Sequence, residues 1–192
     1  MPRSPTLRAR SSIVRLACCL VLVSSACRSP RASQLPDMYA TSLRQHQKMT
    51  SVPDFQAQIQ RDEKRRKTVA RLIARDKLKT GQDHFYAAAL LVNSEHMEQI
   101  RLAQELGLRA AELGDERGFR VAAEAIDREL LKLDQPQKYG TQYVYEPVVK
   151  KWSLYTWNET TSDAERRAMG VPPLAEALAR VEILNKTKPV ED

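Results

Sequence analysis

Apolar residues recur at helical spacing along most of the chain after residue 53. One such stripe follows a 3-4-3 spacing, which places its members on one face of a helix. Its members are Ala103, Leu106, Ala110 and Leu113. Similar stripes predict a mainly α domain over residues 53–185. The helices are expected over roughly residues 54–79, 83–92, 94–113, 116–133 and 174–184, with a short helix after residue 162.

Several residues mark the expected ends of these helices. Ser162 followed by Glu165 is a capping box, and Ser94 is expected to cap the helix that follows it. Three of the helices are expected to end at a glycine or a turn-forming pair, which are common at helix ends. The expected ends are Thr80–Gly81, Gly114 and Gly170.

The helices expected at 94–113 and 116–133 are joined by a short link, which predicts an antiparallel pair. Alanines along their apolar faces permit a close approach of the two helices. The pair resembles one tetratricopeptide or Sel1-type unit. Because no second copy follows at a fixed period, we expect a compact bundle and not a repeat array.

The character of the chain changes after Pro136, where aromatic and β-branched residues become frequent. Six of the eleven aromatic residues lie between Tyr139 and Trp157. The stretches 142–145 and 148–155 alternate in part, and Glu146–Pro147 is a turn signal between them. This pattern predicts a small β-hairpin near 142–155, which must pack on the helices because two strands are only marginally stable alone.

The N-terminal part is typical of an export signal. Residues 1–26 contain four arginines and no acid, followed by an uncharged run from Leu16 to Ala26. The run ends in Val-Ser-Ser-Ala before Cys27, which resembles the lipobox of bacterial lipoproteins, where the cysteine is lipidated. The alternative is an ordinary signal peptide cut near Ala26. Residues 27–52 are polar and are expected to form a flexible tether, and residues 186–192 a polar tail.

The charge of the chain changes once the leader is set apart. The whole sequence carries 31 basic and 24 acidic residues, a net charge of +7. Without residues 1–26 there are 27 basic and 24 acidic residues, and Arg61–Lys79 alone holds nine basic and three acidic ones. The remainder is therefore acidic, and we expect no nucleic-acid partner. We interpret the basic stretch as a solvated helix face; the alternative is contact with anionic lipid headgroups.

One short motif resembles a bacterial family of unknown function. The residues that carry the resemblance are Asp127-Arg128 and Gln135-Pro136-Gln137-Lys138-Tyr139-Gly140-Thr141-Gln142. It extends over roughly residues 62–184. Relatives often carry Gln-His-Gly where this chain has Val92-Asn93-Ser94, so histidine chemistry at that place is lost here. The family implies a mostly helical domain and has no established activity.

The same motif contains the candidate site. Asp127 is expected at the edge of the core, where its carboxylate can accept N–H bonds from the loop after the helix. In one hypothesis Asp127 and Arg128 staple this loop, and in the other they line a small polar pocket with it. A tight turn after the helix favours a glycine with positive φ. The loop residues concerned are Gln137, Tyr139, Gly140, Thr141 and Gln142.

Other chemistry has little support in the sequence. His84 and His96 lie on different expected helices without a known ligand spacing, His46 lies in the expected tether, and no metal or cofactor is expected. No serine stands in a nucleophile motif. We expect a bacterial cell-envelope lipoprotein that acts as a non-catalytic binding or scaffolding module, held to the membrane by its lipid. An envelope protein or the cell wall is the expected partner. The alternative is an envelope hydrolase or other enzyme with its site at Asp127, Arg128 and the Tyr139–Gln142 loop.

Overall fold

The computed structural model of the protein describes residues 31–48 and 52–187. This part of the chain is mainly helical with one two-stranded sheet, which confirms the predicted fold class. After a 3-10 turn at Ala32–Gln34, the elements are α1 (Leu35–Gln47), α2 (Val52–Ala74), α3 (Gly81–Leu91), α4 (Met97–Glu112), α5 (Arg117–Lys132), β1 (Tyr143–Glu146), β2 (Lys151–Leu154), α6 (Asp163–Ala168) and α7 (Leu174–Thr187). The predicted signal peptide, Cys27 and the last residues of the predicted tail lie outside the described residues.

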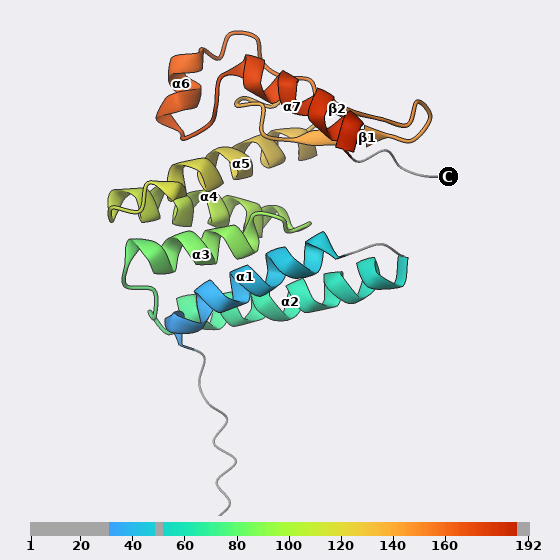
Figure 1. The fold of residues 1–192 in the computed structure, drawn as a ribbon. Helices are drawn as coiled ribbons and strands as arrows, with labels where there is room; N and C mark the ends of the chain where they lie inside the picture. The colour runs from blue at the N-terminus through green and yellow to red at the C-terminus, as the bar shows by residue number, and fades with distance from the viewer. Residues whose placement is uncertain (1–30, 49–51, 188–192) are drawn as a thin grey trace, which may run out of the picture.

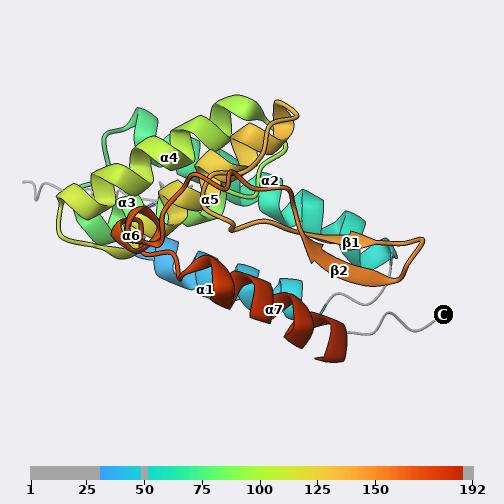
Figure 2. The same ribbon diagram turned by 90° about the horizontal axis from the view of Figure 1, so that it is seen from above.

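The helices stack in layers that follow the order of the chain (Figure 1). The hairpin of α1 and α2 covers α3, α3 packs on α4, and α4 and α5 make the most extensive contact. Beyond α5 lie the β-hairpin, α6 and α7, with α7 packed on β2 (Figure 2). Within the described residues, no helix combines the length and the apolar character needed to cross a bilayer.

The predicted antiparallel pair is α4 and α5, and two glycines set how closely these helices approach. A Cβ on Gly118 would lie 2.1 Å from the carbonyl oxygen of Gly107, and one on Gly107 would lie 2.8 Å from that of Gly118. Ala110 and Ala122 flank this crossing and are fully buried. Hydrogen is therefore the only substituent that fits at the centre of the pair.

The structure corrects the prediction of a flexible tether over residues 27–52. Residues 35–47 form α1, Leu35 is fully buried, and Met38 and Tyr39 pack against the main core. Pro36 stands in the first turn, where its missing N–H costs nothing because that N–H has no partner within the helix. This polar segment contains an apolar face with 3-4 spacing. The segment forms a helix because α2 and α3 supply a surface on which that face is buried.

Two predicted helix boundaries are also corrected. α2 ends at Ala74, and Thr80 begins α3 instead of ending the helix before it. Ser94 does not cap α4, because His96 holds the N-cap position. The buried Ser94 hydroxyl instead donates to Gln99 Oε1 at 2.7 Å and accepts from the His96 N–H at 3.0 Å. Thr80 and Ser94 therefore both form hydrogen bonds at the start of the helix that follows them.

The β-hairpin and the later helix caps follow the sequence signals. Tyr143 to Glu146 pairs antiparallel with Lys151 to Leu154, as predicted. Ser162 and Glu165 form the predicted capping box of α6. Gly114 and Gly170 have φ angles of +89° and +62°, the left-handed conformation expected of a glycine at a helix end. These features depend on residues close in the chain, which is why local patterns predict them.

Thr80 provides a test of local helix capping. Its hydroxyl accepts from the Asp83 N–H at 3.1 Å, and the Asp83 carboxylate accepts from the Thr80 N–H at 3.0 Å. Replacing Thr80 with alanine leaves the Asp83 N–H unpaired at the start of α3, so we expect the free energy of unfolding to fall by about 1 kcal/mol. Urea denaturation followed by circular dichroism measures the change.

The matched control is Thr68→Ala within α2. The Thr68 hydroxyl donates to the Lys64 carbonyl oxygen at 3.0 Å, a bond inside the helix that does not satisfy an otherwise unpaired group. Alanine also has the higher helix propensity. Thr68→Ala is therefore expected to leave stability unchanged or slightly raised, and an equal loss in both variants would contradict the capping role of Thr80.

Candidate functional site

The loop of residues 137–142 is held by the carboxylate of Asp127, which is fully buried in α5. Asp127 Oδ1 accepts from the N–H groups of Lys138 and Tyr139 at 2.7 and 2.8 Å. Asp127 Oδ2 accepts from the N–H and the hydroxyl of Thr141 at 2.9 and 2.8 Å. An ionised carboxylate has about four lone-pair positions, so these four bonds use its accepting capacity. These are the contacts that the stapling hypothesis requires.

A second buried side chain, Gln137, closes the same loop from within. Its Nε2 donates to the carbonyl oxygens of Gln142 and Tyr155 at 3.1 and 3.0 Å, and its Oε1 accepts from the Gln142 N–H at 2.8 Å. The Gln137 backbone also pairs with Thr156 and Asn158 in a short parallel bridge. One glutamine therefore ties the loop to the segment that follows β2.

A third buried side chain, Arg166 of α6, holds the outer side of the loop. Its Nε donates to the Tyr139 carbonyl oxygen at 3.2 Å, and its Nη1 donates to the Thr161 carbonyl oxygen. Nη1 also lies 3.6 Å from Asp163, while Nη2 is buried without a hydrogen-bond partner in the described residues. Arg166 is not predicted from the sequence, because an arginine on a short polar helix has the pattern of a surface residue.

Tyr139 and Gly140 complete the loop. The Tyr139 side chain is buried and packs with Ala123 and Val171. Gly140 has a φ of +78°, and a Cβ there would meet nothing closer than 3.8 Å. Its requirement for glycine therefore comes from the backbone conformation and not from lack of space.

Arg128 does not belong to this loop, which corrects its place in the predicted site. Its Nη2 donates to Asn93 Oδ1 at 2.9 Å, and its Nε is buried without a partner in the described part of the chain. Burial lowers the pKa of the Arg128 guanidinium, and the nearby charges of Glu95 and Glu124 raise it in part. Adjacent residues on α5 therefore serve different neighbours, Asp127 the loop and Arg128 the link between α3 and α4.

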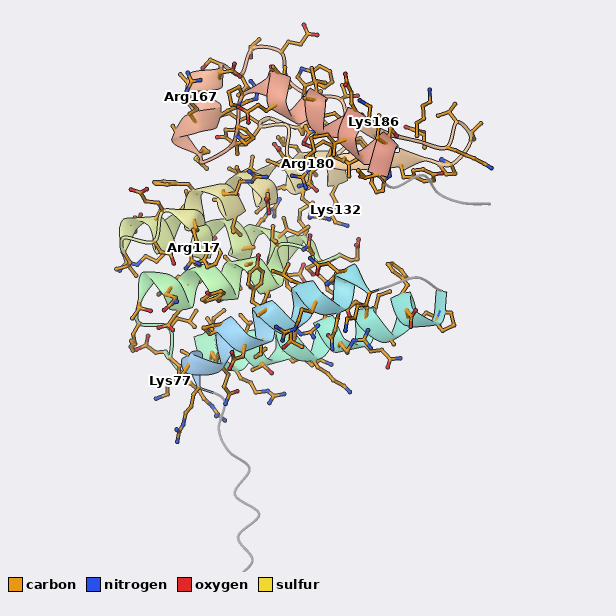
Figure 3. The ribbon with its side chains drawn as sticks, viewed as in Figure 1. Lys77, Arg117, Lys132, Arg167, Arg180 and Lys186 are labelled. Atoms are coloured by element: carbon orange, nitrogen blue, oxygen red, sulfur yellow. The ribbon has the colours of Figure 1, made fainter. Side chains whose placement is uncertain are left out.

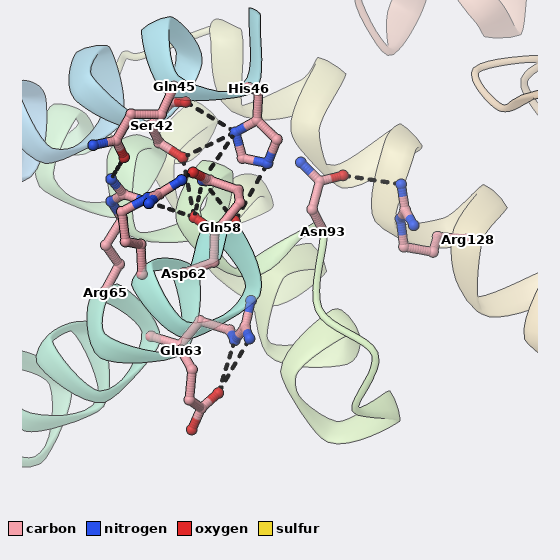
Figure 4. A network of polar contacts seen from close by, with 11 residues as sticks. Ser42, Gln45, His46, Gln58, Asp62, Glu63, Arg65, Asn93 and Arg128 are labelled. Atoms are coloured by element: carbon pink, nitrogen blue, oxygen red, sulfur yellow. Dashed lines mark hydrogen bonds and ion pairs between the residues drawn. The ribbon is translucent and has the colours of Figure 1, made fainter. Parts of the chain in front are cut away.

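A cluster that the sequence analysis did not find lies between α1 and α2 (Figure 4). Ser42 and His46 face Gln58 and Asp62, each pair spaced four residues apart on its helix. Gln58 Nε2 donates to both Asp62 oxygens at 3.0 Å. His46 Nε2 lies 3.3 Å from Asp62 Oδ2, and its Nδ1 lies 2.9 Å from the Ser42 carbonyl oxygen. The repeated i, i+4 spacing was the available signal, once α1 is recognised as a helix.

Serine, histidine and aspartate meet in this cluster, but the serine hydroxyl donates to the aspartate and not to the histidine. The Ser42 hydroxyl donates to Asp62 Oδ1 at 3.3 Å, and it lies 3.4 Å from His46 Nδ1, which is closer to the Ser42 carbonyl oxygen. A serine nucleophile must give its proton to the imidazole. The cluster is therefore a polar contact between two helices and does not activate Ser42.

A cavity of about 180 Å³ opens beside this cluster. That is smaller than the roughly 300–1,000 Å³ of typical small-molecule sites, and its charged lining groups are of both signs. Lys132 donates to Glu95 Oε2, one of its lining groups, at 2.8 Å, and this bond lowers the pKa of Glu95. The residues that line it are His46, Phe55, Gln58, Ile59, Asp62, Arg66, Asn93 and Glu95.

Metal chemistry has no geometric support in the part of the chain that the structure describes. There, no three side chains of the His, Cys, Asp or Glu type are grouped so that they could hold an ion. His84 Nδ1 lies 2.8 Å from the Thr80 carbonyl oxygen on α3, whereas His96 precedes α4. The two histidines therefore lie at the starts of two different helices, α3 and α4.

Comparisons with protein-family models, with curated proteins and with solved structures found no match to this chain.

Proposed function

We propose that the protein is a bacterial cell-envelope lipoprotein whose folded domain is a non-catalytic binding or scaffolding module. Two features of the sequence support export and anchoring: the basic, then apolar stretch of residues 1–26, and the small residues before Cys27. The domain begins soon afterwards, since the 3-10 turn starts at Ala32. A lipid on Cys27 would thus hold the domain close to the membrane.

The observation that carries the non-catalytic part of the proposal is the hydrogen bonding of Asp127. A general base must reach the proton of a substrate with a free lone pair. Asp127 is fully buried, and its carboxylate already accepts four bonds from Lys138, Tyr139 and Thr141. The enzyme alternative at Asp127, Arg128 and the loop would have to break this staple before any reaction, so the geometry favours a structural role.

The tip of the β-hairpin supports a binding role. Val148 is 95% exposed and Val149 is 61% exposed, although both are apolar. The aromatic residues of the hairpin lie farther back, where Tyr145 and Trp152 pack with ring centroids 5.6 Å apart. The tip therefore presents apolar side chains to a partner, while the aromatic pair stabilises the hairpin itself. We propose that this tip contacts an envelope protein.

Mass spectrometry of the mature N-terminus tests the proposed location. We expect a chain that begins at Cys27 and carries the mass of a lipid modification, because the leader is cut directly before a lipidated cysteine. The matched control is Cys27→Ser, which removes the acceptor thiol and should abolish the added mass. A native chain with an unmodified Cys27, or one cut elsewhere, would disprove lipid anchoring.

A further inference from the structure

The end of the domain that lies nearest to Cys27 is strongly basic. α1 and α2 run antiparallel, and Ala32 and Leu35 pack into the same cluster as Leu72 and Leu78. The chain therefore enters α1 beside the place where α2 ends, and Lys77 projects there (Figure 3). We call the exposed cations at this place the basic end. Its members are Arg31, Arg71, Arg75, Lys77 and Lys79.

The charge of the basic end is largely uncompensated. Lys79 pairs with Asp76. The other four cations have no ion-pair partner within residues 31–48 and 52–187. Elsewhere on α2 the pattern differs, because Arg65 pairs with Asp62 at 2.6 Å and Arg66 pairs with Glu63 at 3.1 Å. Arg61 and Lys64 on α2 likewise have no ion pair among the described residues, but the basic end gathers four such cations at the end of α2 and beside the start of α1.

The position of Cys27 limits how far the basic end can move from a membrane. Cys27 is four residues before Arg31, and an extended chain spans about 3.3–3.6 Å per residue, so the two are separated by at most about 14 Å. Electrostatic attraction is screened over about 8 Å at physiological salt. A lipid on Cys27 would hold several cations within or near the range in which an anionic surface attracts them.

We propose that the basic end docks on anionic phospholipid headgroups and orients the domain on the membrane. The inference rests on the lipid anchoring of Cys27 proposed above. It differs from α2 lying lengthwise on the lipid, where Arg65, Arg66 and Lys67 are each held by an acid. Lys64 is the exposed cation without an ion pair in that middle part of the described helix. The anchor and four free cations of the basic end instead define one contact region.

This contact orients the rest of the molecule. The β-hairpin and α7 lie at the opposite side of the stack from the basic end (Figures 1 and 3). With the basic end on the lipid, Val148 and Val149 at the hairpin tip face away from the membrane. The apolar tip is then presented to a partner in the aqueous space and is not inserted into the bilayer.

Vesicle co-sedimentation tests the basic end without the lipid anchor. The probe is the mature chain from residue 27 with Cys27→Ser, mixed with vesicles of phosphatidylcholine alone or with phosphatidylglycerol added. We expect binding to the anionic vesicles only. The triple variant Arg71→Gln, Arg75→Gln and Lys77→Gln should lower the partition coefficient by about 100-fold, which corresponds to about 1 kcal/mol for each basic residue near the surface.

The matched control removes three cations at the other side of the molecule: Arg167→Gln, Arg180→Gln and Lys186→Gln (Figure 3). It has the same net charge, so it should bind nearly as well as the parent. Equal binding to both kinds of vesicle, or equal losses in the two triple variants, would overturn the proposal. Since the probe carries no lipid, a failure here is distinct from an unmodified Cys27 in the mass spectrum.

Discussion

Asp127→Asn is expected to lower the free energy of unfolding by about 3 kcal/mol, because charge-assisted hydrogen bonds are lost and buried donors are left without an acceptor. An asparagine can keep one oxygen toward Lys138 and Tyr139, but its NH₂ group then faces the Thr141 N–H. Two donors cannot satisfy each other, and each buried unpaired group costs about 1–3 kcal/mol. Because small domains are stable by only about 5–15 kcal/mol, this loss is a large share of the total.

Urea denaturation followed by circular dichroism measures this effect, and Glu129→Gln is the matched control. Glu129 is also a carboxylate on α5, but it forms an ion pair with Arg101, whose side chain is 57% exposed. Such surface pairs contribute about 0–1 kcal/mol, so the control should change stability little. A loss below about 1 kcal/mol in Asp127→Asn would contradict the stapling role.

The same variant separates the two hypotheses for the motif. If Asp127 staples the loop, its replacement lowers stability, and the environment of Thr141 changes because its N–H has lost its acceptor. A protein that stays equally stable and loses only a binding or catalytic property would instead support the pocket hypothesis. Hydrogen exchange of the Lys138, Tyr139 and Thr141 amides gives the local readout, which should become faster in the variant.

Gly118→Ala is expected to destabilise the protein by about 3 kcal/mol or more, the range of severe overpacking in a core. The added Cβ would lie 2.1 Å from the Gly107 carbonyl oxygen and 2.8 Å from the Ala110 Cβ. Neither the backbone oxygen nor the helical alanine can move away without separating α4 from α5. In a helix without this contact, the same change would be stabilising by about 1 kcal/mol.

Thermal unfolding of Gly118→Ala and Gly107→Ala provides an internal comparison. A Cβ on Gly107 would be less crowded, with its nearest neighbour, the Gly118 carbonyl oxygen, at 2.8 Å. We therefore expect a smaller loss in Gly107→Ala than in Gly118→Ala. A higher melting temperature in Gly118→Ala would mean that the gain in helix propensity exceeds the cost of the clash with Gly107. That result would contradict the close approach of α4 and α5.

Most secondary structure could be predicted because its determinants are close in the chain. The stripe that contains Ala103 and Leu106 becomes the buried face of α4, and the Ser162–Glu165 capping box starts α6. The hairpin follows from alternation on both sides of Glu146–Pro147. In each case a spacing of two, three or four residues carries the signal, so no knowledge of distant neighbours is needed.

Helix α1 is an element that local patterns do not predict. Leu35, Met38 and Tyr39 form a short apolar face within a polar segment, which by itself is too weak to predict a helix. Its stability comes from burial against the main core. In the folded protein α1 places His46 beside Asp62. The polar cluster therefore could not be predicted without predicting α1.

Local sequence was sufficient to define a helical domain with a small hairpin and to single out Asp127 and the loop after α5 as a unit. It did not reveal that Arg166 closes the same loop, or that Arg128 faces away from it toward Asn93. The reason is physical: charge and polarity are properties of a residue, but burial and hydrogen-bond partners depend on segments far away in the chain. The final packing of α5, α6 and the hairpin thus determines which polar side chains act as staples and which remain at the surface.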